Sequence, residues 1–501
     1  MSEHKRIETN VHRGLAWIGI ASSLVGILDL IALYVITRYF ISRDEYGISR
    51  LGVWIYPILD QATDLGLSAA VIQRDDHTDD QISTVFWINT MLAIALFGVL
   101  AVGAPLSARL MGFPPIVGYM MIAYGTKLLW QNVYFIPVAM MKRELRFKEL
   151  SIIRIIANLA EFAGKIGFAA AGFGIWCFVL GPLARVLVTG IGAQLRHPWR
   201  PRLVFKPRET KEYVTFGLNQ SATQILYYFY TNIHIPIVGY YFGPAAAGLY
   251  GLANEIVLEP IRIISAVIVD VALPTFSKLK YARDSLVAQL AQFTRLNLIT
   301  VMSYSAIVCV AAPQVLAVLF PDYTAAATAV RILSAVAILR SVSLIIPPLL
   351  DGLGYPNRTL VYTATASLVM PIVWIASSVV LSNLGMLSVA IGWVVGYPIA
   401  FGVLVWLAMY TVRWSVWSYF RAIGGVALCM LSAAAVAFGV HVALAGMPAP
   451  LLLAVTAVVV VGTAAMLLAY TQGLSLRTAF KALKGDPQGA ASDGGDDVAP
   501  T

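Results

Sequence analysis

The feature that most constrains this chain is the recurrence of apolar windows of about 20 residues along almost its whole length. A window of that length forms a helix that crosses the hydrocarbon core of a bilayer. Charged residues make up only 12% of the 501 positions, whereas a soluble chain needs about a quarter to cover its surface. The sequence therefore predicts an all-α integral membrane protein with about fourteen transmembrane helices.

The windows place the expected spans to within a few residues. Six precede a proline-broken basic segment at 196–211, and eight follow it. The expected spans are 14–37, 48–71, 82–104, 116–140, 149–172, 174–195, 212–241, 246–273, 288–312, 325–350, 359–382, 386–411, 419–443 and 450–471.

Lysine and arginine collect in alternate loops, and the loops between these are almost free of them. Cytoplasmic loops of membrane proteins carry the excess of positive charge. The basic set includes residues 142–148, 196–211 and 278–283, and both chain ends belong to it. We therefore expect both termini in the cytoplasm. The net charge of +9 does not indicate nucleic-acid binding, because it lies in these short loops.

A weak internal repeat divides the chain. Residues 38–47 and 240–251 share a tyrosine-phenylalanine start and later glycines, and each leads into a helix rich in acids. Six helices per unit give both copies the same orientation, which is a parallel repeat. We expect an N-terminal six-helix lobe (1–195), a basic cytoplasmic linker (196–211), a C-terminal six-helix lobe (212–411), two additional helices (412–484) and a disordered acidic tail (485–501).

Ionisable residues inside the expected spans are the best indication of function, because a charge at membrane depth is costly unless it is paired or hydrated. Four deep cations have no evident acid one turn away and are expected to line a polar cavity: Lys127, Lys165, Arg185 and Arg340. Arg154 and Arg262 are further candidates for substrate binding. The cations slightly outnumber the acids, which favours an anionic substrate.

Six acids are candidates for gating or ion coupling: Asp29, Asp60, Asp64, Glu161, Glu255 and Glu259. Alternatives remain for several of these groups. Arg154 lies near a helix end, where its side chain can snorkel to the interface. Glu259 and Arg262 can form an ion pair within one helix, and the two aspartates at 60 and 64 can bond tyrosines.

The expected seventh helix carries amides, tyrosines and His234, which suit sugar rings but also suit ordinary packing. His234 is either a proton-sensitive switch or a hydrogen-bonded core residue. The three cysteines lie in apolar windows without metal-ligand spacing, so no metal or cofactor is expected. The residues leave open whether H⁺ or Na⁺ is a coupling ion.

Several segments resemble the Wzx-type polysaccharide flippases of the multidrug/oligosaccharidyl-lipid/polysaccharide exporter superfamily, closest to the lipopolysaccharide-biosynthesis and colanic-acid-exporter branch. The segments that carry the resemblance are Phe216–Asn219, Gly239–Ala253 with Pro260, Leu273–Ser277, Leu59–Arg74 and Leu350–Pro356. One departure is His234, near which relatives often carry an acid; it puts an ion-coupling role of this helix in doubt.

The resemblance implies two six-helix lobes around a central cavity, and two extra C-terminal helices. It also implies a transporter of the bacterial inner membrane, not an enzyme. By alternating access it would move undecaprenyl-diphosphate-linked oligosaccharide for O-antigen, capsule or exopolysaccharide synthesis, with a polysaccharide polymerase and assembly proteins as further partners.

Three other functions remain open. An O-antigen polymerase or ligase would need a large periplasmic loop with arginine and histidine, and every expected periplasmic loop is short. A cation-coupled multidrug exporter of the same superfamily would favour an acidic cavity. A lipid II flippase fits for the same reason as a polysaccharide flippase, because both substrates are diphosphate lipids.

Overall fold

The structure is a computed structural model that describes residues 26, 28–64, 67–68, 71, 78–208 and 210–472, with only the backbone at 63–64 and 211–220. No strand occurs within these ranges, and residues 28–39 form part of the first helix. The tail expected at 485–501 and the start of the first span lie outside the described residues. The helices described next are α2 (Arg43–Val53), α3 (Tyr56–Asp64), α5 (Asp79–Leu110), α6 (Pro115–Arg143), α7 (Phe147–Phe168) and α8 (Cys177–Arg196).

The second part of the chain is helical as well. Its helices are α9 (Lys211–Asn232), α10 (His234–Leu279), α11 (Arg283–Val310), α12 (Ala312–Leu319), α13 (Ala327–Gly352), α14 (Pro356–Val380), α15 (Leu387–Val412), α16 (Val416–Ala443) and α17 (Ala449–Gln472). Short turns of other helix types connect some of them, at Ala169–Phe173, Gly174–Trp176, Pro321–Ala326 and Ser382–Leu384.

The chain is a multi-pass membrane protein. Within the described ranges, eight helical stretches are long and apolar enough to cross a bilayer. They are Asp79–Leu110, Phe147–Arg196, Arg283–Val310, Pro321–Gly352, Pro356–Val380, Leu387–Val412, Val416–Ala443 and Ala449–Gln472. The count of fourteen spans remains a prediction.

Most of the expected spans coincide with a helix, and the differences have local causes. The expected span 48–71 is divided into two helices: α2 ends at Val53, and α3 begins at Tyr56. The turn expected between 241 and 246 lies at Gly243, whose φ of 83° interrupts α10. Glycine tolerates a positive φ, and the proline that follows it, Pro244, has no amide hydrogen to continue the helix.

Local signals set the start of two helices. Ser42 caps α2, and the side chain of Glu45 accepts a hydrogen bond from the Ser42 amide at 2.8 Å. Thr78 and Gln81 form the same reciprocal pair at the start of α5. Such capping boxes satisfy amide groups that have no partner in the first turn. They fix where α2 and α5 begin.

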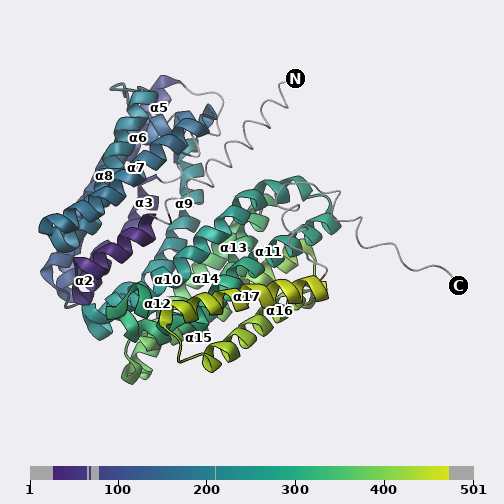
Figure 1. The fold of residues 1–501 in the computed structure, drawn as a ribbon. Coiled ribbons are helices and arrows are strands. Elements are labelled where there is room, and N and C mark those ends of the chain that lie inside the picture. The colour runs from purple at the N-terminus through teal and green to yellow at the C-terminus, as the bar shows by residue number, and fades with distance from the viewer. Residues whose placement is uncertain are drawn as a thin grey trace.

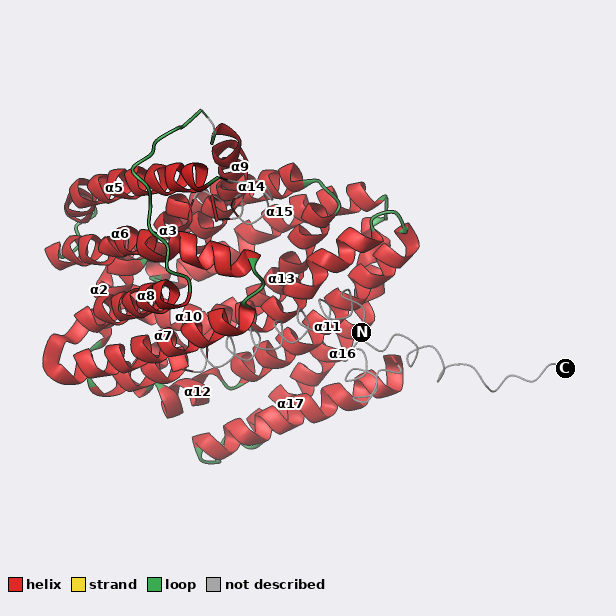
Figure 2. Cartoon of the chain, turned by 90° about the horizontal axis from the view of Figure 1, so that it is seen from above, coloured by secondary structure: helices red, strands yellow, loops and turns green. Residues whose placement is uncertain are grey.

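Figure 1 shows two groups of helices. One contains α2, α3 and α5 to α8, the other contains α11 to α17, and α9 and α10 lie between them. Helices α7 and α8 pack on each other, as do α10 and α13. Seen from above (Figure 2), α16 and α17 lie at the outer side of the second group, where both pack on α11. The first group contacts α10 through α2 and α9 through α3, and α10 and α9 pack in turn on α13 and α14 of the second group.

The two segments of the sequence repeat meet where α2 crosses α10. A Cβ added at Gly47 would overlap the carbonyl oxygen of Pro244, and one added at Gly248 would lie 2.5 Å from the carbonyl oxygen of Arg43. The contact is therefore reciprocal: each glycine faces the carbonyl four residues before the other glycine. Small residues let helix backbones approach this closely, so glycine is required at both positions.

Replacing Gly47 with alanine is expected to force α2 and α10 apart, because the added methyl group has no space. Overpacking of this kind costs about 1–3 kcal/mol. Ser49, buried beside the crossing, reports the separation. In a background without the native cysteines, Ser49→Cys should react several-fold faster with a maleimide when Gly47→Ala is present. Gly98→Ala, with open space around its Cβ, is the matched control, and equal rates for both would contradict this view of the crossing.

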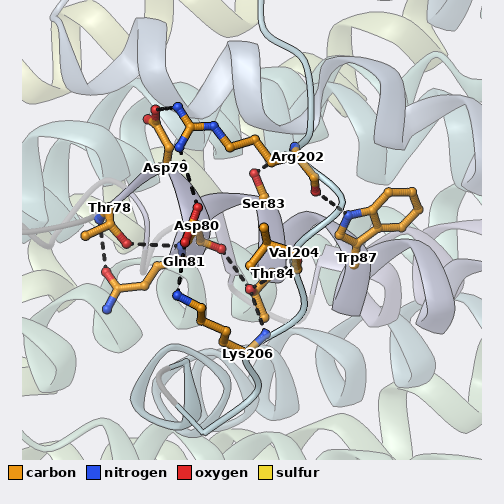
Figure 3. Close-up of polar contacts among 10 residues, drawn as sticks. All are labelled: Thr78, Asp79, Asp80, Gln81, Ser83, Thr84, Trp87, Arg202, Val204 and Lys206. Carbon is orange, nitrogen blue, oxygen red and sulfur yellow. Dashed lines mark hydrogen bonds and ion pairs between the residues drawn. The ribbon is translucent and has the colours of Figure 1, made fainter.

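The basic segment between α8 and α9 is held against the start of α5. We call residues 197–206 the strap. Figure 3 shows Arg202 paired with Asp79 at 2.7 Å and Lys206 paired with Asp80 at 3.0 Å. The backbone is bound as well: the amides of Arg202 and Lys206 donate to the Ser83 and Thr84 hydroxyls, and the Trp87 indole donates to the Arg202 carbonyl. The positive charges of Arg202 and Lys206 therefore neutralise acids of the same chain.

Candidate functional site

A cavity of about 750 Å³ lies between the two groups of helices. Its wall is formed by the first helix, α2, α3, α6, α7 and α8 on one side, and by α9, α10 and α13 on the other. All six cations predicted from the sequence line it: Lys127, Lys165, Arg185, Arg340, Arg154 and Arg262. Six charges from five helices thus converge on one space.

The predicted acids divide into three groups. Asp29, Asp60, Glu255 and Glu259 line the cavity together with the cations. Glu161 lies behind the wall, where it contacts two of the cations. The side chain of Asp64 lies outside the described residues.

Glu161 is the centre of a buried charge cluster. Its side chain is only 6% exposed, and its carboxylate lies 2.8 Å from Lys165 Nζ and 3.1 Å from Arg185 Nε. Lys165 also contacts Asp29 at 3.0 Å. The sequence-based view that Lys165 and Arg185 lack a nearby acid is therefore wrong. Glu161 precedes Lys165 by one helical turn, and packing of α7 on α8 brings Arg185 to the same carboxylate.

An ion pair across the cavity was not predicted. Arg50 of α2 contacts Glu255 of α10 at 2.5 Å, next to the glycine crossing. Glu255 was a candidate, but Arg50 lies near the start of its expected span, where a cation needs no special explanation. The pair depends on contact between helices about 200 residues apart in sequence, and a single sequence carries no signal for it.

Two alternatives considered for the acids occur in the structure: an ion pair within one helix and a hydrogen bond from a tyrosine. Glu259 and Arg262 form an ion pair on the same helix, and both side chains remain about half exposed. Asp60 accepts hydrogen bonds from the Tyr56 hydroxyl at 3.0 Å and from Gln131. These acids are thus occupied by neighbours within the wall of the cavity.

Three cations have no carboxylate partner among the described side chains: Lys127, Arg154 and Arg340. Lys127 is 3% exposed, and its ammonium group lies 3.8 Å from the centre of the Tyr56 ring. The Arg340 guanidinium lies 5.2 Å from the centre of the Trp393 ring. Aromatic faces stabilise a cation without neutralising it, so these groups remain available to an anion in the cavity.

Aromatic and amide groups complete the wall. Tyr227, Tyr228 and Asn232 of α9, which is the expected seventh helix, line the cavity. His234 does not reach it. This side chain is buried among the ring edges of Tyr250, Trp374 and Trp393, with ring centres 5.4–5.6 Å away. It is a core residue, and neither ring nitrogen has a hydrogen-bonding side chain there.

The lining residues carry an excess of positive charge. Seven cations, including Arg50, face the cavity against four carboxylates, and Glu161 behind the wall makes five. Glu161 and Asp29 offset the charges of Lys165 and Arg185. The α10 acids Glu255 and Glu259 offset those of Arg50 and Arg262. Asp60 is the remaining carboxylate, so a net excess of two positive charges is shared among Lys127, Arg154 and Arg340, which come from both groups of helices. A cavity with this charge and these aromatic faces suits an anionic ligand that carries rings.

Known proteins with similar sequences take part in making surface polysaccharides. TuaB of Bacillus subtilis, a teichuronic acid biosynthesis protein, is 27% identical over 75% of this chain and 78% of its own length. WzxC of Escherichia coli, a lipopolysaccharide biosynthesis protein, is 24% identical over 53% of this chain and 54% of its own length. ExoT of Rhizobium meliloti, a succinoglycan biosynthesis transport protein, is 22% identical over 55% of each chain.

Solved structures with this fold are membrane transporters. The lipid II flippase MurJ in its inward closed conformation superimposes with a TM-score of 0.70 at 12% identity, over 90% of this chain and 98% of MurJ. An inward-facing multidrug resistance MATE family transporter gives a TM-score of 0.57 at 17% identity, over 77% of this chain and 98% of its own. The pattern of the polysaccharide biosynthesis protein family matches residues 35–327, more than half of the sequence. The chain belongs to that family.

Proposed function

We propose that this protein is a flippase that moves an undecaprenyl-diphosphate-linked oligosaccharide across the bacterial inner membrane by alternating access. Both termini face the cytoplasm, and the glycan enters the synthesis of a surface polysaccharide. The observation that carries the proposal is the set of three cations without carboxylate partners, Lys127, Arg154 and Arg340, in a cavity between two groups of helices.

The chemistry of the cavity supports a diphosphate lipid as substrate. A diphosphate diester carries two negative charges, and it binds most strongly to cations that are not neutralised by the protein. The tyrosines of α9 offer rings on which sugars can stack. A cationic drug would meet an excess of like charge in the same space, which disfavours a multidrug exporter.

The arrangement of the helices supports alternating access. The first group of helices contacts α10 through α2 and α9 through α3, and the cavity lies between these two contacts. Separation at one contact while the other holds would open the cavity to one side at a time. The names of the relatives, which include a succinoglycan biosynthesis transport protein, support transport rather than catalysis, and the pathway supplies a polymerase and assembly proteins as partners.

Deletion of the gene tests the proposal. Complete lipid-linked repeat units should then accumulate in the cytoplasmic leaflet, where membrane-impermeant periodate oxidises them in inverted vesicles but not in intact cells. Shortened polymer with normal transbilayer distribution would instead indicate a polymerase. Incomplete repeat units would indicate a glycosyltransferase, and either result would overturn the proposal.

A further inference from the structure

A second pocket, of about 620 Å³, lies at the end of the bundle where α14 begins, α15 ends and α16 begins. It is separate from the cavity between the two groups of helices and shares no lining residue with it. Its ten lining residues include two arginines, Arg358 and Arg413, and no carboxylate. Tyrosine and tryptophan make up four of the others: Tyr355, Trp406, Tyr410 and Trp414.

Neutral side chains position Arg358, and backbone contacts fix the turn that carries Arg413. Arg358 lies between two tyrosine rings, 4.7 Å from the centre of Tyr355 and 5.1 Å from that of Tyr410, and it donates to the Thr411 hydroxyl. Arg413 adopts a left-handed backbone conformation (φ 53°) that ends α15. Arg283 of α11 fixes this turn by donating to the carbonyls of Val412 at 3.1 Å and Arg413 at 2.6 Å.

The outer face of α15 connects the pocket to the lipid phase. Val395, Ile399, Trp406 and Tyr410 are all exposed, by 52–66%, and they recur at intervals of one or two turns, so they form one apolar stripe. Tryptophan and tyrosine at the end of such a stripe are typical of the membrane–water interface. The stripe leads from the expected depth of acyl chains to the two guanidinium groups, and a soluble anion would make no use of it.

We propose that this pocket binds an anionic phospholipid, with the headgroup phosphate on Arg358 and Arg413 and the acyl chains along α15. Basic pockets at the ends of transmembrane helices recognise such headgroups through paired cations. The site lies where α16 departs from α15 to pack on α11, so the bound lipid would fill the space between the core of the bundle and its last two helices.

Native mass spectrometry of the delipidated full-length protein, titrated with dioleoyl phosphatidylglycerol, tests the proposal. Replacing both arginines, Arg358→Gln with Arg413→Gln, should weaken binding by about 10–30-fold, because each cation adds about fivefold to the affinity for an anionic headgroup. Arg421→Gln, an exposed cation of α16 outside the pocket, is the matched control and should leave binding unchanged. Equal binding by the double variant and the control would overturn the proposal.

Two further variants make the result independent of folding defects. Arg358→Lys with Arg413→Lys keeps both charges and should bind within about threefold of the wild type, while Tyr410→Leu should weaken binding by about threefold through loss of one aromatic contact. Three probes identify the ligand. Dioleoyl phosphatidylcholine and glycerol phosphate should each bind at least about tenfold more weakly than phosphatidylglycerol. Tighter binding of undecaprenyl phosphate would mean a substrate site, and would overturn the proposal.

Discussion

Replacing Glu161 with glutamine is expected to destabilise the protein by about 3–5 kcal/mol, the largest effect of any single substitution at the cavity. The Glu161 carboxylate, whose side chain is 6% exposed, is the shared partner of Lys165 and Arg185 in the wall of the cavity. Without it, two cations lie close together with only Asp29 nearby, and their desolvation is no longer offset. Thermal unfolding in detergent should show a lower midpoint, and membranes should contain less of the variant.

Two variants show whether the effect arises from charge. Glu259→Gln also removes an acid from an arginine, but that pair is 40–53% exposed and should contribute less than about 1 kcal/mol. Combining Glu161→Gln with Lys165→Met removes one of the stranded cations and should recover part of the lost stability. If Glu161→Gln and Glu259→Gln lower the midpoint equally, the buried cluster does not stabilise the fold.

Replacing Lys127 with methionine is expected to have the opposite pattern, with a large loss of transport and no loss of stability. The Lys127 side chain is buried, and no described carboxylate lies within ion-pair distance of its ammonium group, although Asp60 acts on it at longer range. In the empty protein the charge is a cost, so the variant should unfold at the same temperature or higher. An anionic substrate loses a charge-assisted contact of about 1.5–3 kcal/mol, which corresponds to about 10–150-fold in binding.

The measurement is surface polysaccharide in a deletion strain that carries the variant, compared at equal amounts of protein in the membrane. Lys127→Arg keeps the charge and should restore most of the export. Lys148→Met is the matched control, because Lys148 is an exposed lysine outside the cavity. Normal export by Lys127→Met at normal protein levels would exclude this cation from substrate binding.

The helices and the cations of the cavity could be predicted from the sequence for the same physical reason. A bilayer requires long apolar windows, so their positions predicted α5 to α8, α11 and α13 to α17 to within a few residues, whereas the short α12 was not predicted. The same requirement makes an interior charge conspicuous, so Lys127, Arg154 and Arg340 were identified without any knowledge of their neighbours. Their convergence on one cavity follows from the packing of the helices.

The ion pairs between helices could not be predicted from the sequence in this way. Arg185 meets Glu161 because α7 packs on α8, and Arg50 meets Glu255 because α2 crosses α10. Neither contact has a fixed spacing along the chain. The glycines at 47 and 248 belong to the sequence repeat, but that repeat did not indicate that its two copies touch each other. The distinction between paired and free cations, on which the proposed function depends, therefore required the structure.

The contacts of the strap determine where chimaeras of this protein and its relatives should be joined. Because Arg202 and Lys206 are bound to Asp79 and Asp80 of α5, the strap belongs with the first half of the chain. A chimaera joined after Arg208 keeps these partners from one parent, whereas a junction at 197 separates them. Hybrids of the first kind should assemble more often, and they would show which half of the chain selects the glycan.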